Sequence, residues 1–579
     1  MRSTAVAPLS RWKLRPSPGT AAEALARPLG LRPLTAGLLW QRGVRTAEDA
    51  TQILEPSLRH LPDPTRLPQF AEALAAFEEA RAKGHKVLIH GDYDVDGTCG
   101  SVLLHLLCQR LGMESEVFIP DRLRDGYSFG EGSLAAIRQA NAQLVIAVDN
   151  GTSAVEPLKV LAAEGRQVLV VDHHLPGKEL PPAAALLNPW LADKDDDLFP
   201  HFCGTGVAWL FAWGVLRHVL AEDKLPERDR RFLMDSLGLV AIATVGDVMP
   251  LQGPNRALVR AGLETLPESS LPGLRALTAA AKLRGPAQAS DVAFRLAPRL
   301  NAAGRLFQAE VSFRLLATSR TDEAEALCAQ LEEMNLERRR IQEQQLAALQ
   351  SDVQIQLESG AKVIFAGSEE AHFGVLGVVA SQICEQSGLP TLLWAGCDGG
   401  VARGSGRAPE GSHLVQLMDH VGSSFQGYGG HARAAGFHFD PSQADAIAEG
   451  LRQAAESMPA PPPPLLEVDA EISPGELDAA TIDEFQRLEP FGEGFPAPKF
   501  LSSNLQLAAD PRTIGDGSHA ELRLQRDHEV VRCLAWRQAE RLRPLAAGDR
   551  VDVVISASIN AWRGRRNVEW TLHDIRPAT

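Results

Sequence analysis

Three carboxylates lie within five residues, directly after an apolar, strand-like run. The run is Lys86–His90, and the acids that follow it are Asp92, Asp94 and Asp96 in the sequence GDYDVDG. Acids this close repel one another and lose hydration beside a buried strand, so a bound cation is the simplest explanation. The alternative is a solvated turn, because Asp and Gly are also common turn residues.

Two later strand-like runs end in side chains of the same kind. The run LVIAV is followed by Asp149, and the run QVLVV is followed by Asp172-His173-His174. Ligand sites of open α/β sheets lie outside the carboxyl ends of the strands, so these termini should converge on one crevice. Taken alone, Asp149 could be a helix N-cap and the His pair could be structural. Their convergence is what predicts a site.

A further acid, Asp247, follows the apolar run LGLVAIATVG and could reach the same crevice, although an ordinary turn residue fits its local sequence equally well. Asp with one or two His favours Mn²⁺ or Mg²⁺ over zinc held by thiolates, and imidazole tilts the choice toward Mn²⁺. Five or so ligands suffice for two ions about 3.5–4 Å apart, a geometry that suits in-line displacement at phosphorus. The residues therefore predict hydrolysis of a phosphoester.

Two glycine-rich clusters could contact a phosphate. They are Gly404-Ser405-Gly406-Arg407 and Gly429-Gly430-His431-Ala432-Arg433. Glycine permits close approach of the backbone to a phosphate, and Arg supplies a bidentate donor. Each cluster fits a hairpin turn equally well by itself.

Aromatic residues lie beside several of these motifs. The 3 tyrosines of the chain are Tyr93, Tyr127 and Tyr428, and stacking on a base and hydrogen bonding to the motifs are equally good interpretations. Near the C-terminus, Trp562-Arg563-Gly564-Arg565-Arg566 places an aromatic beside basic residues at an expected hairpin tip. This segment is either a single-strand contact or a solvated basic turn.

The hydrophobic pattern predicts α/β lobes followed by a β module. Apolar runs at 86–90, 144–148, 167–171 and 184–188 lack polar alternation and are separated by helical patterns, which indicates a parallel sheet covered on both faces. We divide the chain into an N-terminal segment 1–70 packing on the first lobe, a catalytic lobe 71–318, a connecting helix 319–352, a smaller α/β lobe 353–458 and an all-β module 465–579 of small-barrel size.

Composition excludes several classes of protein. The 579 residues are 45% hydrophobic and 23% charged, as in globular proteins, and the net charge of −15 excludes a chain-wide attraction to nucleic acid while allowing a local basic patch. The 7 cysteines form no CxxC pair, so neither a disulfide framework nor a zinc ribbon is indicated. We see no signal peptide, membrane span or P-loop, and expect a cytoplasmic protein with no membrane contact and no ATP-driven motor.

The motifs GDYDVDG, VDNG, VDHH and VGD, in that order, resemble those of the DHH phosphoesterases, and GGHARAAGF at 429–437 resembles the signature of the DHH-associated domain. From about residue 30 onward, the chain is most similar to the members of this family that are single-strand-specific DNA exonucleases. The resemblance implies a parallel-sheet DHH domain, a smaller α/β DHH-associated domain joined to it by a long helix, and an all-β barrel of the OB type.

The resemblance also implies roles for individual residues. The metal ligands would be Asp94, Asp96, Asp149, His173 and Asp247, with Asp149 bridging two ions, and His90 would be a weaker ligand candidate. Asp92 and Asp172 would support these ligands, and His174 would donate to the scissile phosphate. The terminal 5′ phosphate would bind Arg122, Ser405 and Arg407, with further nucleic-acid contacts from Arg305, Gly429, Gly430, His431, Trp562 and Arg563.

The activity implied by the resemblance is 5′→3′ digestion of single-stranded DNA to mononucleotides in repair and recombination, by a monomer that works with a helicase and a single-strand-binding protein. One alternative is a DHH hydrolase of short oligoribonucleotides or cyclic dinucleotides, whose members usually lack the long helix and the β module. Another is a metal-free scaffold protein, which the presence of every motif acid disfavours.

Overall fold

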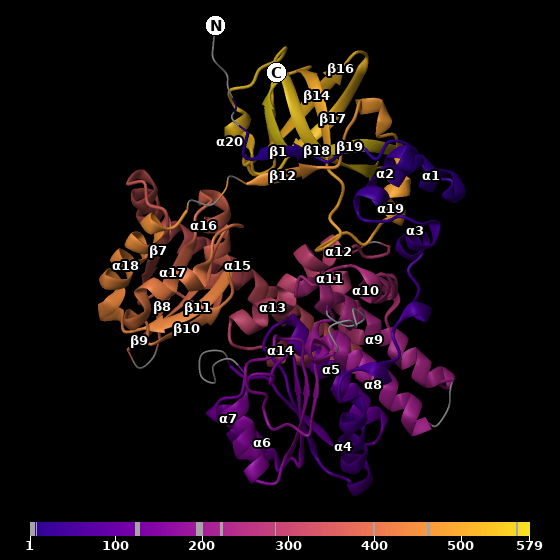
Figure 1. Cartoon of the computed structure of the whole chain (residues 1–579), viewed down its shortest axis with the longest axis vertical. Helices are drawn as coiled ribbons and strands as arrows, with labels where there is room; N and C mark the ends of the chain where they lie inside the picture. The colour runs from indigo at the N-terminus through magenta and orange to yellow at the C-terminus, as the bar shows by residue number, and fades with distance from the viewer. Residues whose placement is uncertain are drawn as a thin grey trace. The chain divides into compact units, whose positions relative to one another are not determined.

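The computed structural model describes residues 6, 8–121, 128–192, 201–220, 224–283, 285–397, 400–459, 462, 464–562 and 565–578 (Figure 1). The chain folds into two compact units. One unit comprises Leu58–Pro462 with Gly492–Gly494, and the other comprises Met1–Ser57, Pro463–Phe491 and Phe495–Thr579.

The first lobe of the larger unit is built on a five-stranded parallel sheet with the strand order β3-β2-β4-β5-β6. Its strands are β2 (Val87–His90), β3 (Ser115–Phe118), β4 (Leu144–Val148), β5 (Gln167–Val171) and β6 (Ala185–Leu187). The expected parallel sheet is therefore confirmed. Strand β3 was not anticipated, because its residues SEVF are only partly buried and do not form an apolar run.

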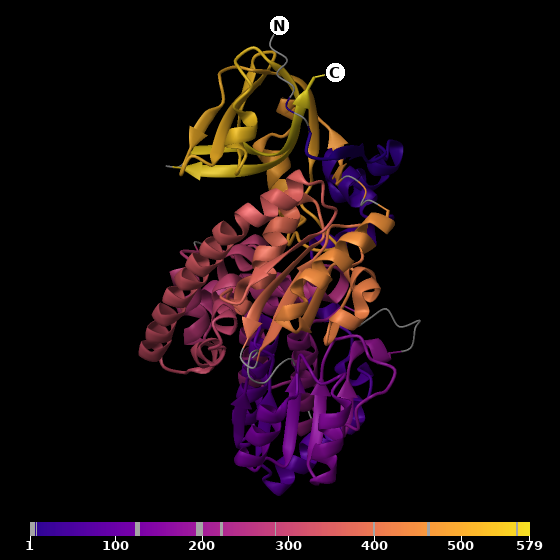
Figure 2. The same ribbon diagram turned by 90° about the vertical axis from the view of Figure 1, so that its left-hand side faces the viewer.

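Helices cover both faces of this sheet, as its apolar runs predict (Figures 1 and 2). One core includes Phe77, Leu104 and Phe211, and a second, on the other face, includes Ile137 and Leu158. The helices concerned are α4 (Phe70–Lys83), α5 (Val95–Arg110), α6 (Glu131–Ala140), α7 (Val155–Ala163), α8 (Gly204–Leu220) and α9 (Glu227–Gly246). The lobe continues through α10 (Gly253–Thr265), α11 (Pro272–Ala280), α12 (Ala289–Asp291), α13 (Ala297–Arg305) and α14 (Glu310–Ala317).

A single long helix, α15 (Thr321–Glu358), joins the two lobes. It packs on α11, α13 and α14 of the first lobe and on β7 (Ile364–Ser368) and α16 (Leu376–Ser387) of the second. The connecting helix expected from the absence of Pro and Gly is confirmed, and it extends beyond the expected end at residue 352, since the next glycine is Gly360.

The second lobe contains a mixed sheet with the strand order β10-β11-β9-β8-β7. Its strands are β7 (Ile364–Ser368), β8 (Thr391–Cys397), β9 (Val401–Arg407), β10 (Gly427–Gly430) and β11 (Ala434–Phe439). Strands β7 and β8 are parallel, and the remaining pairs are antiparallel. The helices of this lobe are α16 (Leu376–Ser387), α17 (Leu414–Val421) and α18 (Ala444–Ser457).

The expected β barrel forms most of the smaller unit. Its sheet has the order β13-β14-β18-β19-β17-β16-β15, and an additional pairing of β14 with β16 closes the ring. The strands are β13 (Ala470–Glu471), β14 (Phe500–Leu507), β15 (Arg512–Ile514), β16 (His519–Arg526), β17 (Glu529–Ala535), β18 (Arg550–Trp562) and β19 (Arg565–Pro577), with α19 (Ala479–Arg487) and α20 (Ala539–Leu542) beside them.

The N-terminal segment packs on this barrel, so the expectation that it packs on the first lobe was wrong for residues up to Ser57. Helices α1 (Thr20–Leu29), α2 (Pro33–Gln41) and α3 (Ala47–Leu54) place Leu25, Leu39 and Ala50 in one core with Phe500 and Trp570 of the barrel. The amphipathic pattern of these short helices predicts an apolar face but does not identify the surface that covers it.

A strand pairing and a buried acid attach this segment to the barrel unit. Strand β1 (Arg11–Leu14) pairs in parallel with β12 (Leu465–Val468). The carboxylate of Asp574 is fully buried and accepts hydrogen bonds from Leu9 N, Ser10 N and Trp12 Nε1, the last at 2.8 Å. Arg541 Nη2 lies 2.5 Å from the same carboxylate.

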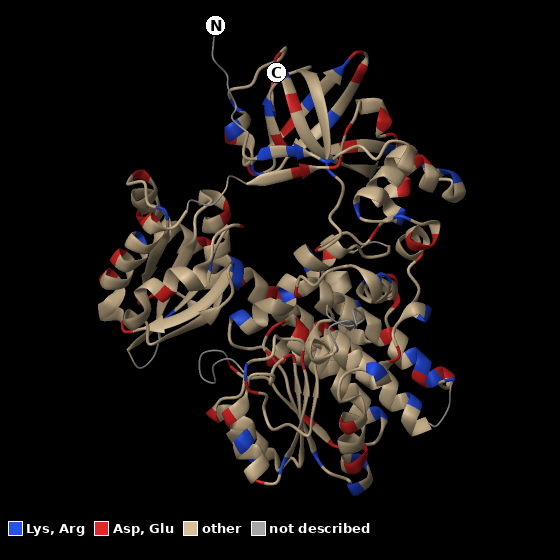
Figure 3. Cartoon of the chain, viewed as in Figure 1, with Lys and Arg blue, Asp and Glu red and all other residues tan. Residues whose placement is uncertain are grey.

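Charged residues of both signs are interspersed along the described ribbon (Figure 3). Among the described helices, none combines the length and apolar character that crossing a bilayer requires.

We predict that Asp574→Ala lowers the free energy of unfolding of the barrel unit by about 3 kcal/mol, because several buried donors lose their acceptor at once. Urea denaturation measures this loss, and trypsin should then cleave near Arg11 and Lys13 faster than in the wild type. The control is Asp516→Ala, since exposed Asp516 accepts only local hydrogen bonds from Ser518. Equal losses in both variants would contradict the anchoring role of Asp574.

Candidate active site

The acids and imidazoles predicted from the sequence meet at the carboxyl ends of the parallel strands. Asp92 and Asp94 follow β2, Asp149 follows β4, the DHH tripeptide follows β5, and Asp247 caps the end of α9. Their side chains form overlapping groups whose potential ligand atoms lie within 4.8 Å of one another. The groups are Asp149 with Asp172, His173 and His174; Asp96 with His173 and Asp247; and Asp92 with Asp94 and Asp149.

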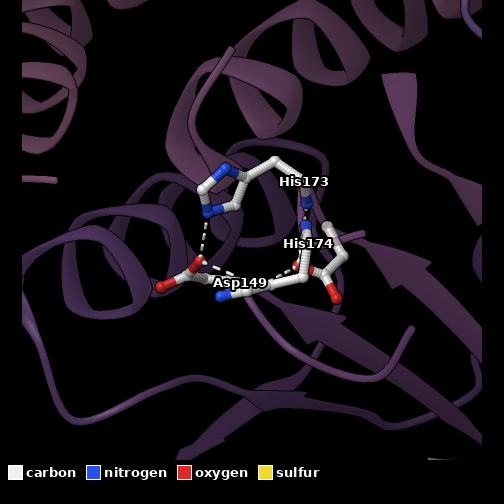
Figure 4. A group of neighbouring side chains, drawn as sticks. Asp149, His173 and His174 are labelled. Atoms are coloured by element: carbon white, nitrogen blue, oxygen red, sulfur yellow. Dashed lines mark hydrogen bonds and ion pairs between the residues drawn. The ribbon is translucent and has the colours of Figure 1, made fainter. Parts of the chain in front are cut away.

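His173 lies near three acids of this cluster, and Figure 4 shows its ring beside Asp149. Its Nε2 atom is 3.1 Å from Asp149 Oδ1, 3.6 Å from Asp247 Oδ2 and 3.7 Å from Asp96 Oδ2. Burial lowers the pKa of this imidazole, which favours the neutral form that binds a cation.

Asp172 holds and orients the neighbouring His174. Its Oδ1 atom accepts from His173 N and lies 2.8 Å from His174 Nδ1, and its Oδ2 atom accepts from Thr152 N. Burial opposes the imidazolium, but the hydrogen bond and charge of Asp172 outweigh it and raise the pKa of His174 to about 9. In the metal-free protein His174 therefore carries a proton, and its side chain is 45% exposed.

The first turn of α8 binds Asp96, a contact that the sequence analysis missed. Asp96 Oδ2 accepts from Gly204 N at 2.7 Å, and Oδ1 accepts from Thr205 N at 2.8 Å. A Cβ at position 204 would lie 2.9 Å from the Cβ of Asp149, so glycine lets the helix approach both acids. The Gly-Thr-Gly sequence that opens this apolar helix was the available signal.

The cluster fits divalent cations. Burial and then the charges of neighbouring acids raise the pKa of Asp149, of Asp94 and of Asp247, the last to about 8. A cation would remove this penalty, and carboxylates with imidazole are ligands that suit Mn²⁺ or Mg²⁺. The groups Asp96/His173/Asp247 and Asp92/Asp94/Asp149 share no residue, so the arrangement has room for two ions.

The backbone conformation of Asp149 and a contact made by Asn301 help to position the acids of this cluster. Asp149 has a φ of 62°, a left-handed conformation that Asp and Asn tolerate better than most residues. Asn301 Oδ1 accepts from Val95 N at 2.9 Å and so ties the start of α5, where Asp94 and Asp96 lie, to α13. Asn301 also escaped the sequence analysis, since its partner lies 206 positions away.

His90, the weaker ligand candidate, does not belong to any of these groups. Its ring is fully buried, stacks on Phe129 at 4.0 Å, and pairs with Asn150 Oδ1 at 3.1 Å and Ser133 Oγ at 2.9 Å. Burial lowers its pKa to about 4. Because both ring nitrogens have protein partners, His90 supports the end of β2 and was wrongly considered as a ligand.

Three of the expected phosphate-contact residues line one cavity of about 300 Å³ within the larger unit. They are Arg305 from α13 and Ser405 and Arg407 from β9, and Asp94 of the acid cluster lines the same cavity. Gly377, in the first turn of α16, also lines it, and a Cβ there would lie 3.0 Å from Arg407 Nη2. Glycine at this position therefore leaves room for the guanidinium of Arg407 beside the start of α16.

A neighbouring cavity of about 810 Å³ is lined by Tyr93, Arg403, Tyr428 and Gly429 among others. Arg403 was missed, although the alternation of side chains along β9 places it on the same face as Ser405 and Arg407. Gly430 ends β10 and His431 follows it in the turn to β11, and neither residue lines either cavity.

Some predicted contacts lie outside the described residues. These are Arg122, Tyr127 and Arg563, together with the side chain of Trp562, whose backbone ends β18.

The fold and the acid cluster define a DHH phosphoesterase. The DHH family, N-terminal domain, matches residues 86–244, the DHHA1 domain matches residues 360–457, and the RecJ OB domain matches residues 468–574. The resemblance seen in the sequence motifs is therefore confirmed, as is the succession of an α/β lobe, a smaller α/β lobe and a barrel.

The chain belongs to the RecJ family. The single-stranded-DNA-specific exonuclease RecJ of Thermus thermophilus is 35% identical over 577 residues, which cover 99% of this chain and 78% of that protein. The protein of the same name from Bacillus subtilis is 31% identical over 587 residues, covering 98% and 72%.

Solved structures agree with this assignment. The crystal structure of RecJ from Thermus thermophilus in complex with Mn²⁺ matches with a TM-score of 0.84 and 34% identity, covering 98% of this chain and 80% of that one. A crystal structure of exonuclease RecJ bound to manganese matches with a TM-score of 0.60 and 36% identity, covering 68% and 96%.

We predict that Mg²⁺ or Mn²⁺ stabilises the protein more at pH 8 than at pH 6. An acid with a raised pKa holds its proton in the folded state, so between about pH 4 and pH 8 the metal-free protein loses stability as the pH rises. A cation replaces that proton most easily at the higher pH. Thermal unfolding should show an increase in Tm of about 3 °C or more at pH 8.

The matched control for this experiment is Asp149→Asn, because Asp149 belongs to two of the ligand groups. The increase in Tm should be much smaller in this variant. An increase that is the same at both pH values, or the same in the variant, would argue against cation binding by these acids.

Proposed function

We propose that this protein is a metal-dependent exonuclease that hydrolyses single-stranded DNA from the 5′ end and releases mononucleotides. The observation that carries the proposal is the cavity of about 300 Å³ that Arg305, Ser405 and Arg407 line together with Asp94 of the acid cluster. The basic residues of this cavity suit a terminal phosphate, and the acids suit the cations that act on the next one.

The terminal phosphate would bind at the start of α16. Arg407 Nη1 donates to Ser405 Oγ at 3.0 Å, which holds the guanidinium beside Gly377. Guanidinium groups and the backbone N–H groups of a helix start are the usual ligands of a phosphate dianion. Binding of the terminal phosphate here would therefore require a free 5′ end. Because the cavity would hold only a short length of strand between the terminal phosphate and the acids, the enzyme would release one nucleotide at a time.

The acid cluster would hold two Mn²⁺ or Mg²⁺ ions, and Asp149, which belongs to two of the ligand groups, would be a central ligand. Bound cations supply a nucleophile at neutral pH and neutralise charge at the phosphorus. The role of His174 is to donate from the crevice to the scissile phosphate as negative charge develops, and Asp172 keeps the ring in that orientation.

The barrel would bind the strand beyond the active site, as OB-type barrels do. From family membership we further infer a cytoplasmic monomer that acts in DNA repair and recombination beside a helicase and a single-strand-binding protein. The alternative of a hydrolase for short oligoribonucleotides or cyclic dinucleotides is less favoured, because the match to RecJ proteins extends over 99% of the chain and includes the barrel.

We predict that Asp149→Asn abolishes digestion of a 5′-phosphorylated strand while single-strand binding is retained. The variant removes this central carboxylate, and Asn tolerates the positive φ of 62° at this position. A gel of product sizes and fluorescence anisotropy measure the two properties. The control is Asp235→Asn, which lies on α9 but outside the ligand groups and should keep its activity. Full nuclease activity of Asp149→Asn would contradict the two-ion mechanism.

We predict that Arg407→Gln reduces the preference for a 5′-phosphorylated strand over a 5′-hydroxyl strand by about 10–100-fold, the value of a lost charge-assisted hydrogen bond. The ratio of kcat/KM on the two strands measures this preference. Arg452→Gln should leave the ratio unchanged, because Arg452 is exposed on α18 and pairs with Glu449. An unchanged ratio in Arg407→Gln would place the 5′ phosphate elsewhere.

A further inference from the structure

A strained turn follows the last acid of the active site. Val248, directly after Asp247, has a φ of 58°. Val248 N donates to Val245 O at 3.2 Å and Met249 N donates to Thr244 O at 3.0 Å, the bonding pattern of a Schellman motif. Val248 thus occupies the left-handed position of that motif, where glycine is usual and a β-branched residue is an outlier.

Three other described helices of the same unit end in this turn with a residue other than glycine, and one of them ends at Asn141, a residue type that tolerates the left-handed conformation. At the end of α13, Phe307 has a φ of 61°, and its ring stacks on His372 with centroids 5.3 Å apart. At the end of α11, Lys282 has a φ of 53° and an exposed side chain whose charge is solvated. Val248 has neither compensation, because its apolar side chain is 64% exposed.

The position of Val248 suggests what its side chain contacts. Gly246 lines the cavity that contains Arg305 and Arg407, and the next residue, Asp247, lies 3.6 Å from His173 Nε2. The end of α9 therefore runs from the phosphate cavity to the acid cluster. Under the proposed function, the 5′-terminal nucleotide spans this interval, with its own phosphate in the cavity and the scissile phosphate at the acids.

We propose that Val248 packs against the base of the 5′-terminal nucleotide and is retained in a strained conformation for that contact. Strain at an exposed residue beside an active site is expected where the residue serves the ligand rather than the fold. The side chain offers only methyl groups, so the contact would act on all bases alike. This inference rests on the proposed function and adds a substrate-positioning residue to it.

The test combines Val248→Gly with two 5′-phosphorylated strands, one normal and one whose 5′-terminal nucleotide is a tetrahydrofuran abasic analogue. Glycine relieves the strain, so the variant should unfold at the same temperature as the wild type or higher. We expect kcat/KM on the normal strand to fall about tenfold, as for a lost apolar contact, and kcat/KM on the abasic strand to change less than twofold. Val248→Ile should retain activity on both strands.

Lys282→Gly is the matched control, because it makes the same change in the same turn at the end of α11, a helix that contributes no residue to the ligand groups or to either cavity. It should keep wild-type kcat/KM on both strands. The increase in Tm caused by Mn²⁺ should be equal in Val248→Gly and the wild type, which shows that Asp247 has kept its place.

Wild-type kcat/KM of Val248→Gly on the normal strand would overturn the inference. An equal loss on both strands would also overturn it, because Val248 would then act on the acids and not on the base. Failure of the wild type to digest either strand would instead overturn the proposed function, and the inference with it.

Discussion

The mutual repulsion of buried carboxylates is the constraint on which the first lobe depends. Asp94, Asp149 and Asp247 come from three different elements and share one water-poor crevice, where burial and neighbouring charge raise the pKa of each. Such a cluster is stable only with protons or cations among the acids. The surrounding groups reduce this repulsion locally, since the first turn of α8 donates to Asp96 and His173 lies between the acids. The parallel sheet and its apolar helices supply the rigidity that holds like charges together.

The second lobe contributes Arg407, a positive charge, to the cavity that Asp94 of the acid cluster also lines. Strand β9 directs Ser405 and Arg407 to the same face, and Gly377 leaves room for the guanidinium. Helix α13 contributes Arg305 to the same cavity and, through Asn301, supports the loop that carries Asp94. One helix of the first lobe thus connects the basic residues of the cavity to the acids, and under the proposed function it would fix the spacing between a terminal phosphate and the cations.

The barrel unit is held together by a closed sheet, a core shared with the N-terminal helices and a buried carboxylate. Its sheet closes through the pairing of β14 with β16, and the N-terminal helices complete its core with residues such as Leu39. A buried carboxylate, Asp574, collects donors from Leu9, Ser10 and Trp12. The two ends of the chain therefore form one folding unit, and the nuclease lobes lie between them in the sequence.

Residue types and short-range periodicity were enough to predict the acid and imidazole motifs, the parallel sheet, the long helix and a β module of barrel size. They were not enough to predict which distant groups come into contact. Three such contacts appear only in the folded protein. His90 pairs with Asn150 and Ser133, the first turn of α8 binds Asp96, and Asn301 binds Val95 from 206 positions away. The same holds for the N-terminal segment, whose helices show an apolar face but not its partner. Contacts between residues far apart in the chain depend on how complete elements pack, and local patterns carry no information about that packing.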